Sequence, residues 1–216
     1  IIDPDGFPYS AKQTALMQMV TPQSQGGPTE NDPAPNSQER SDPSSMSEEQ
    51  KKQLAEQADQ ANFEKLEQQV RESLAKNPNL QNLKDQVQFS REKEGLRIEI
   101  IDKADFAMFP SGGTNMADKA DKLVQEVAAA LNKIPNKVAI RGHTDSVPFA
   151  KGSGKNNWAL SGERAEATRS LLEKAGVSEK RFERIEGVAD TDPFNPKDPK
   201  DPRNRRMSIT VLNIDN

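Results

Sequence analysis

The chain has 216 residues, of which 32% are hydrophobic and 30% are charged, so one packed core cannot account for its whole length. Its 30 basic and 34 acidic residues give a formal charge of -4, whereas a general nucleic-acid-binding protein ordinarily carries a basic excess. No cysteine is present, which excludes disulfides and cysteine-based metal sites. No apolar run reaches the roughly 18 residues of a transmembrane helix.

Residues 1–45 are rich in Pro, Gln, Ser, Gly and Asn. A segment of this composition buries too little apolar surface to offset the entropy lost on ordering, so we expect a disordered, flexible linker. One short apolar stretch, from Ala15 to Val20, interrupts it before Pro22. The stretch is either a transient helical turn or a short functional segment.

A long helix is predicted over residues 46–78. Ser47 can cap its start with Gln50 as the capping-box partner, and Asn77-Pro78 ends it. Apolar residues recur along it at near-helical spacing: Leu54, Ala58, Ala61, Phe63, Leu66, Val70 and Leu74. Burying one large apolar side chain contributes ~1.5–3 kcal/mol, so the stripe should pack on the next domain, on a second copy of the chain, or on both.

Residues 79–216 show the pattern of one α/β domain. Alternating apolar residues on either side of Glu94-Gly95 predict a β-hairpin. The elements expected after it are a helix over 115–132, a strand from Val138, a helix from about Trp158 to Gly176, and strands near 182–188 and 207–211. This order predicts a two-layer α/β sandwich, a mixed β-sheet with helices on one face.

Polar residues gather where the strand from Val138 ends and where the next helix begins. The strand end reads G-H-T-D from Gly142 to Asp145, and the helix start reads N-x-x-L-S-x-x-R-A from Asn157 to Ala165. A strand-loop-helix connection can therefore bring Asp145 and Arg164 together.

These two motifs resemble the signature of OmpA-like peptidoglycan-binding domains. Three further features resemble MotB-type flagellar stator proteins more specifically: Pro148-Phe149, Trp158 and Asn204-Arg205-Arg206. The resemblance covers roughly residues 86–213. It implies an OmpA-like fold and a non-catalytic domain that anchors the flagellar motor stator to the cell wall.

The resemblance also implies a ligand site. Arg164 is expected to pair with the carboxylate of diaminopimelate in the peptidoglycan stem peptide, and Asp145 with its ammonium group. A guanidinium group matches a carboxylate in two parallel hydrogen bonds, which supports this assignment. The alternative is a structural salt bridge between Asp145 and Arg164. The other expected peptidoglycan-binding residues are Thr144, Asn157, Leu160, Ser161 and Arg205.

Several of these positions have two readings. Ser161 either contacts the ligand or hydrogen-bonds the backbone, and Trp158 and Phe149 either stack on sugar or pack in the core. Arg205 and Arg206 should point to opposite faces of a strand, so only one of them is expected to approach the cleft. His143 is the only histidine. Without a second histidine or a cysteine it makes a poor zinc site, so no metal, cofactor or catalytic role is expected.

The predicted partners are peptidoglycan, a second copy of the chain in a homodimer, and a MotA-type membrane stator subunit in the full-length protein. We expect a periplasmic location, with the protein anchored in the inner membrane by a segment absent here. MotB-type proteins begin with a cytoplasmic tail and a transmembrane helix, and then carry a short plug. We therefore expect the given sequence to start after the transmembrane helix, and residues 1–10 are either native or vector-derived. The stretch from Ala15 to Val20 is expected to match the plug.

The sequence leaves two alternatives to the stator function. An OmpA- or Pal-type tether between the outer membrane and peptidoglycan would use the same site, although the sequence has no lipobox cysteine for the Pal type. A peptidoglycan hydrolase would need a nucleophile, a metal set or a pair of acids. No such arrangement is evident in the sequence.

Overall fold

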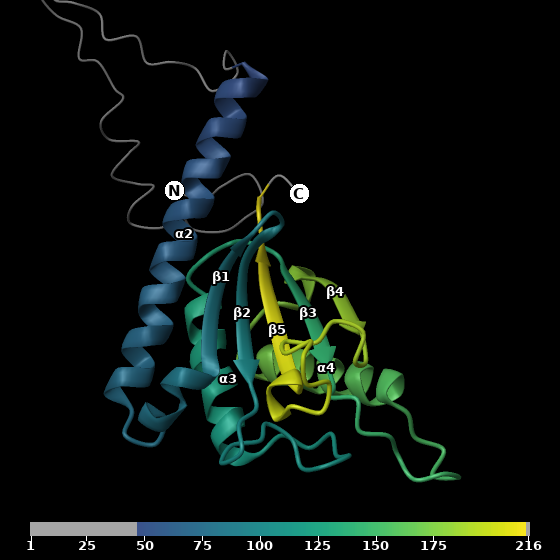
Figure 1. The fold of residues 1–216 in the computed structure, drawn as a ribbon. Coiled ribbons are helices and arrows are strands. Elements are labelled where there is room, and N and C mark those ends of the chain that lie inside the picture. The colour runs from purple at the N-terminus through teal and green to yellow at the C-terminus, as the bar shows by residue number, and fades with distance from the viewer. Residues whose placement is uncertain (1–46, 215–216) are drawn as a thin grey trace, which may run out of the picture. The chain divides into compact units, whose positions relative to one another are not determined.

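The structure is a computed structural model that describes residues 47–214 (Figure 1). The flexible linker predicted over 1–45, with its plug segment, lies outside the described residues. Within 47–214, no helix combines the length and the apolar character needed to cross a membrane.

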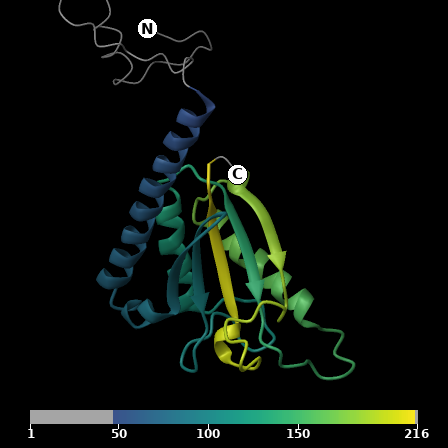
Figure 2. The same cartoon turned by 45° about the horizontal axis from the view of Figure 1, so that its top comes forward.

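A five-stranded mixed sheet forms the centre of the described part of the chain. The elements in chain order are α2 (Glu48–Lys76), a short 3₁₀ helix (Gln81–Gln86), β1 (Val87–Glu92), β2 (Gly95–Ile101), α3 (Asp118–Leu131), β3 (Val138–His143), α4 (Asn157–Lys174), β4 (Phe182–Gly187) and β5 (Arg206–Leu212). The strand order is β1-β2-β5-β3-β4, with β3 and β4 parallel and the other pairs antiparallel. Helices α3 and α4 lie behind one face of the sheet (Figures 1 and 2). The predicted α/β sandwich is thereby confirmed.

The helix-covered face of the sheet forms the core. Its largest fully buried strand residues are Leu96, Ile98, Ile100, Ile140 and Met207. The alternation of Val138 and Ile140 is typical of a half-buried strand, but Ala139 on the opposite face is only 5% exposed. The reason is its place inside the sheet, where Arg184 of β4 and Thr210 of β5 flank it in register.

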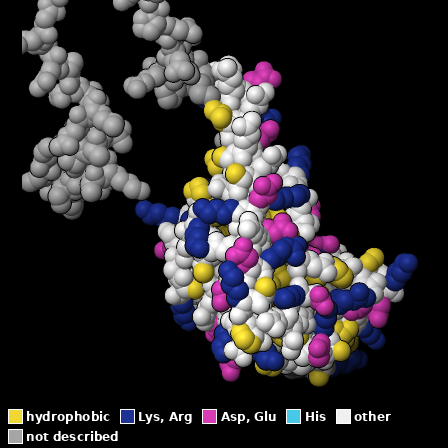
Figure 3. All heavy atoms as spheres, turned by 90° about the vertical axis from the view of Figure 1, so that its left-hand side faces the viewer, with side chains coloured by type: hydrophobic (Ala, Val, Ile, Leu, Met, Phe, Trp, Pro, Cys, Tyr) yellow, Lys and Arg dark blue, Asp and Glu magenta, His cyan; other side chains and the backbone are white. Residues whose placement is uncertain are grey.

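Helix α2 begins with the predicted capping box. Gln50 donates its backbone N–H to the Ser47 hydroxyl at 3.2 Å, and the Gln50 side chain accepts from the Ser47 N–H at 2.9 Å. Phe63, Leu66, Val70 and Leu74 are buried in the common core, so this part of the stripe packs on the same chain. Figure 3, which views the molecule from the side of α2, shows charged side chains of both signs along the helix.

The N-terminal residues of the predicted apolar stripe do not pack against the domain. Leu54 is 52% exposed, and Ala58 and Ala61 are also exposed. Leu54 precedes Phe63 by nine residues. At 3.6 residues per turn, nine residues make two and a half turns, so the two side chains leave opposite sides of the helix.

A buried polar cluster fixes the N-terminal half of α2 to the domain. The Asp59 carboxylate accepts the Asn136 side-chain N–H at 2.6 Å and the Ile214 backbone N–H at 2.9 Å. Asn136 also donates to the Leu212 carbonyl at 2.9 Å and accepts from the Asn62 side chain at 3.0 Å. The cluster thus joins α2 to the turn after α3 and to the end of β5.

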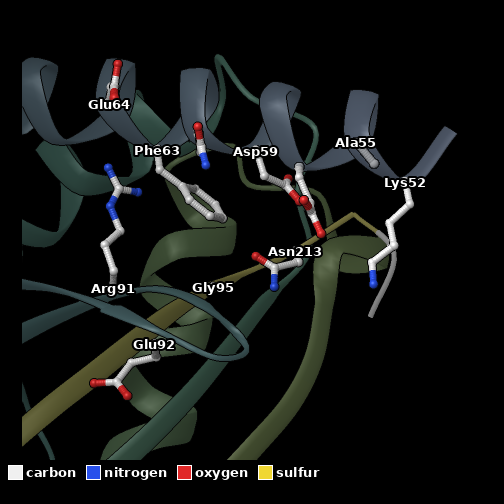
Figure 4. A pocket seen from close by; sticks show the side chains of 11 residues that line it. Lys52, Ala55, Asp59, Phe63, Glu64, Arg91, Glu92, Gly95 and Asn213 are labelled. Atoms are coloured by element: carbon white, nitrogen blue, oxygen red, sulfur yellow. The ribbon is translucent and has the colours of Figure 1, made fainter. Parts of the chain in front are cut away.

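A groove of about 510 Å³ remains beside this cluster, between α2 and the β1-β2 hairpin. Asp59 and Phe63 point from the helix toward the strands, and Arg91 extends from the strand side toward the helix (Figure 4). The Arg91 guanidinium lies 5.2 Å from the centroid of the Phe63 ring. Docking of α2 therefore combines apolar burial, a cation-π contact and the polar cluster around Asp59.

The face of the sheet away from α3 and α4 carries charged side chains in pairs. Arg141 lies 2.8 Å from Glu186, and Arg206 lies 2.9 Å from Glu99. His143 is buried among them, with Nε2 3.2 Å from the Ser208 hydroxyl. Burial first, and then the nearby Arg206, Arg141 and Arg97, lower the pKa of His143 to about 3. The imidazole is therefore neutral near pH 7.

We expect Asp59→Ala to lower the free energy of unfolding by ~1–3 kcal/mol, because it leaves the N–H groups of Asn136 and Ile214 without their acceptor. Urea denaturation measures the change, and limited proteolysis reports whether α2 has loosened. Glu64→Ala, at an exposed position of the same helix, is the matched control and should change stability by less than about 0.5 kcal/mol. Equal effects in the two variants would show that the Asp59 contacts do not hold the helix.

His143 should make the protein less stable as the pH falls. In the unfolded chain its pKa is near 6.5, so between about pH 6.5 and the folded value of about 3 the unfolded state binds the extra proton. The loss should reach on the order of a few kcal/mol toward the acid end and be absent above about pH 6.5.

Urea denaturation of the wild type and of His143→Gln, at about pH 4.5 and about pH 7.5, measures this contribution. The carboxylates titrate in both proteins, so the difference in pH dependence belongs to His143. The variant should lose less stability on acidification. An identical loss in the two proteins would contradict a buried neutral histidine.

Candidate functional site

The first turn of α4 lies directly against the carboxyl ends of β3 and β4. A Cβ atom on Gly142 would stand 2.1 Å from the Ser161 carbonyl oxygen, and one on Gly187 would stand 2.3 Å from the Gly162 nitrogen. Any side chain at either position would push the helix away. The glycine of the G-H-T-D motif thus permits the close approach that builds the site.

Helix α4 begins at Asn157, one residue before the predicted start. The Asn156 side chain caps it by accepting the Ala159 N–H at 2.8 Å. Asn157 then donates its side-chain N–H to the Asp145 carbonyl at 3.1 Å. The two motifs identified in the sequence are therefore joined by a direct hydrogen bond.

Asp145 is paired with Arg205. Its Oδ2 accepts from Nη1 of Arg205 at 2.8 Å, and its Oδ1 accepts the Val147 N–H at 3.1 Å. Nε of Arg205 donates to Oδ2 of Asp102 at 3.0 Å. One guanidinium group thus bridges two carboxylates, and the ion-pair partner of Asp145 is Arg205 and not Arg164.

Arg164 is 3% exposed and is held by the loop before α3. Its Nε donates to the Gly113 carbonyl at 3.0 Å, its Nη2 donates to the Pro110 carbonyl at 3.1 Å, and its guanidinium carbon lies 5.0 Å from the centroid of the Phe109 ring. Neither hydrogen bond uses Nη1, so the end of the guanidinium group keeps donors for a carboxylate. Burial lowers the pKa of Arg164, while the charges of Asp102 and Asp145 act in the opposite direction.

The sequence analysis missed Asp102, which follows β2 and is 3% exposed. Its Oδ1 accepts the Met108 N–H at 2.8 Å, and its Oδ2 accepts from Arg205. Burial raises the pKa of Asp102, against the lowering effect of these two hydrogen bonds. The only signal in the sequence was a carboxylate directly after a run of strand residues, and no motif surrounds it.

The side chains of Asn204, Arg205 and Arg206 lie in three different places. Asn204 is 1% exposed and fastens the preceding loop, accepting the Asn195 N–H at 2.7 Å and donating to the Asp198 carbonyl at 2.9 Å. Arg205 reaches the two site carboxylates, whereas Arg206 bonds Glu99 on the open face of the sheet. Of the two arginines, Arg205 is the one whose guanidinium group bonds the site carboxylates, although Arg206 also lines the small cavity beside them.

The other predicted site residues lie around this cluster. Ser161 is fully buried, and its hydroxyl accepts the Ala189 N–H at 3.0 Å and donates to the Trp158 carbonyl at 3.0 Å, so the backbone-bonding reading holds. Thr144 and Leu160 are buried too, and the Thr144 hydroxyl has no hydrogen-bond partner within residues 47–214. Trp158 is 58% exposed, which excludes core packing.

The charged groups enclose little free space. A cavity of only about 10 Å³ lies among them, lined by the charged or polar residues Asp102, His143, Arg164, Arg205 and Arg206 and by Met108, Phe109 and Met207. A ligand must therefore bind at the rim or separate the Arg205–Asp145 pair. In the described range, no group of three or more His, Asp or Glu residues could hold a metal ion. What the geometry offers is paired charges of both signs, which suits a ligand carrying a carboxylate and an ammonium group.

Comparison with known proteins shows which proteins this chain resembles. Residues 108–206 match the model of the OmpA family. Motility protein B of Escherichia coli K12 is 33% identical over 161 residues, which are 74% of this chain and 52% of that protein. The chain therefore spans about half the length of this relative.

Two solved structures resemble the fold. A MotB-like protein from Desulfovibrio vulgaris is 20% identical with a TM-score of 0.60, covering 74% of this chain and 99% of the other. The cell wall anchor of the T6SS from Pseudomonas aeruginosa is 29% identical with a TM-score of 0.50, covering 60% and 89%. Taken with the motifs and the arrangement of strands, these matches show that residues 108–206 form an OmpA-like domain and that the chain is similar to Motility protein B.

Proposed function

We propose that this chain binds peptidoglycan through Asp145 and Arg164 and thereby anchors a flagellar motor stator to the cell wall. The observation that carries the proposal is the way in which the guanidinium group of Arg164 is held. Two backbone carbonyls hold the buried guanidinium group in a fixed direction, and its Nη1 is left for a ligand. An arginine fixed in this way can take a carboxylate with little loss of side-chain entropy.

The ligand we propose is diaminopimelate of the stem peptide. Its carboxylate pairs with Arg164, and its ammonium group pairs with Asp145, which also keeps the Val147 N–H. In this arrangement Arg205 is the third charged group of the site, and Thr144, Asn157, Leu160 and Ser161 shape and support it. Exposed Trp158, in the first turn of α4, is available to a neighbouring sugar.

The stator function is preferred to the OmpA- or Pal-type tether because of the identity to Motility protein B. The T6SS protein is named a cell wall anchor, and it shares this fold at 29% identity. We further propose a periplasmic location, a MotA-type membrane partner and a homodimer. The exposed Leu54, Ala58 and Ala61 on α2 give a second copy an apolar strip to contact.

Arg164→Ala should abolish co-sedimentation of the protein with purified peptidoglycan, and Asp145→Ala should weaken it strongly. Losing one partner of a largely desolvated charge pair costs ~2–5 kcal/mol in binding. Arg169→Ala is the matched control, since Arg169 lies on the same helix and bonds Glu166 and Glu173 outside the site. Circular dichroism checks that each variant is folded. Unchanged sedimentation of folded Arg164→Ala would rule out the proposed site.

The proposal of a non-catalytic domain, and against a hydrolase, has its own test. Incubation of purified peptidoglycan with the protein should release no soluble fragments, measured by chromatography of the supernatant against a lysozyme-treated control. Release that disappears in Asp145→Ala would instead identify an enzyme.

A further inference from the structure

Asp102 is bonded to both charged halves of the site. Its Oδ1 accepts the N–H of Met108, which begins the loop whose Pro110 and Gly113 carbonyls hold Arg164. Its Oδ2 accepts from Nε of Arg205, whose Nη1 reaches Asp145. The side chain is 5% exposed, so water competes little for either bond. Asp102 also lies before residues 108–206, where the OmpA family match begins.

Arg205 stands where a ligand's ammonium group would bind. Its Nη1 is 2.8 Å from Oδ2 of Asp145, and an ammonium group pairing with that oxygen must compete with it. The same guanidinium group is 3.0 Å from Asp102. Arg205 therefore pairs with two carboxylates at once. The stronger its ion pair with Asp102, the weaker its ion pair with Asp145.

Neutralising Asp102 would change how Arg205 pairs with Asp145. Asp102 and Asp145 are the carboxylates within 4 Å of Arg205 in the described part of the chain. Without the charge of Asp102, the half-buried guanidinium group would depend on Asp145 alone. Asp145 would then be less available to an ammonium group, while Arg164 would keep its carbonyl partners.

We propose that Asp102 is a positioning residue that sets the specificity of the site for ligands with an ammonium group, by competing with Asp145 for Arg205. The inference rests on the proposed function and deepens it. It predicts a selective effect: the ammonium subsite depends on the charge of Asp102, and the carboxylate subsite at Arg164 does not.

The test compares two peptides by calorimetric titration of the whole chain. One is the stem tripeptide ending in meso-diaminopimelate, and the other ends in 2-aminopimelate, which keeps the terminal carboxylate but lacks the terminal ammonium group. Asp102→Asn keeps the size of the side chain and an oxygen for the Met108 N–H. It should weaken binding of the first peptide by about tenfold and of the second by less than about twofold.

Asp105→Asn is the matched control, because it removes the same charge at an exposed position of the adjoining loop. It should leave both affinities and their ratio unchanged. If Asp102→Asn does not fold, Arg205→Gln gives the second variant. Removing the competitor of the ammonium group should keep or increase the preference for the diaminopimelate peptide, and a loss of that preference would overturn the inference.

The outcomes distinguish a failure of this inference from a failure of the proposed function. Equal weakening of both peptides by Asp102→Asn would show a merely structural role, and no change would show that Asp102 does not act on the site. Either result overturns the inference while leaving the proposed function in place. If the wild type bound neither peptide nor peptidoglycan, the proposed function would fail, and this inference with it.

Discussion

The close contact between the first turn of α4 and the ends of β3 and β4 is the constraint on which the site depends. Gly142 and Gly187 allow it, because a Cβ atom on either would overlap the backbone of the helix. The contact places Asn157 against the loop after β3, so that Asp145 is held by a side chain of α4. Residues of one helix and one loop thereby acquire a fixed geometry.

The charges of the site are balanced in a way that suits reversible binding. Asp102 and Asp145 face Arg205, and Arg164 is satisfied mainly by carbonyl oxygens. A buried guanidinium group held only by neutral acceptors retains much of its attraction for an anion, because carbonyl dipoles offset its charge incompletely. By contrast, Asp145 already has a cation beside it. In the proposed binding mode, the carboxylate end of a ligand meets an arginine without a carboxylate partner, and the ammonium end meets an aspartate that must first be released from Arg205.

The fold and part of the candidate site could be predicted from the sequence. Alternation in β1 and β2, the capping box at Ser47 and the glycine stop after α4 are local signals, and each element appears where it was predicted. The Arg205–Asp145 pair joins residues 60 positions apart, and the Asp102–Arg205 pair joins residues 103 apart. Neither pairing has a local signature, because the first depends on β3 and β5 being neighbours in the sheet and the second on β2 and β5. The same holds for Asp59, whose partners are set by how α2 docks.

The attachment of α2 and the candidate site lie at opposite ends of the sheet. Asp59 bonds groups at the start of β3 and the end of β5, whereas Asp145 and Arg205 follow β3 and precede β5. β5 spans seven residues, so the two ends are ~20 Å apart along the strand.

If the chain serves as the proposed tether to the cell wall, these strands join the attachment around Asp59 to the ligand site. Antiparallel β3 and β5 share a ladder from Val138–Val211 to His143–Arg206. Helix α2 buries Phe63, Leu66, Val70 and Leu74 in the same core as the strands. The helix, the sheet and the site at its far end therefore belong to one packed unit.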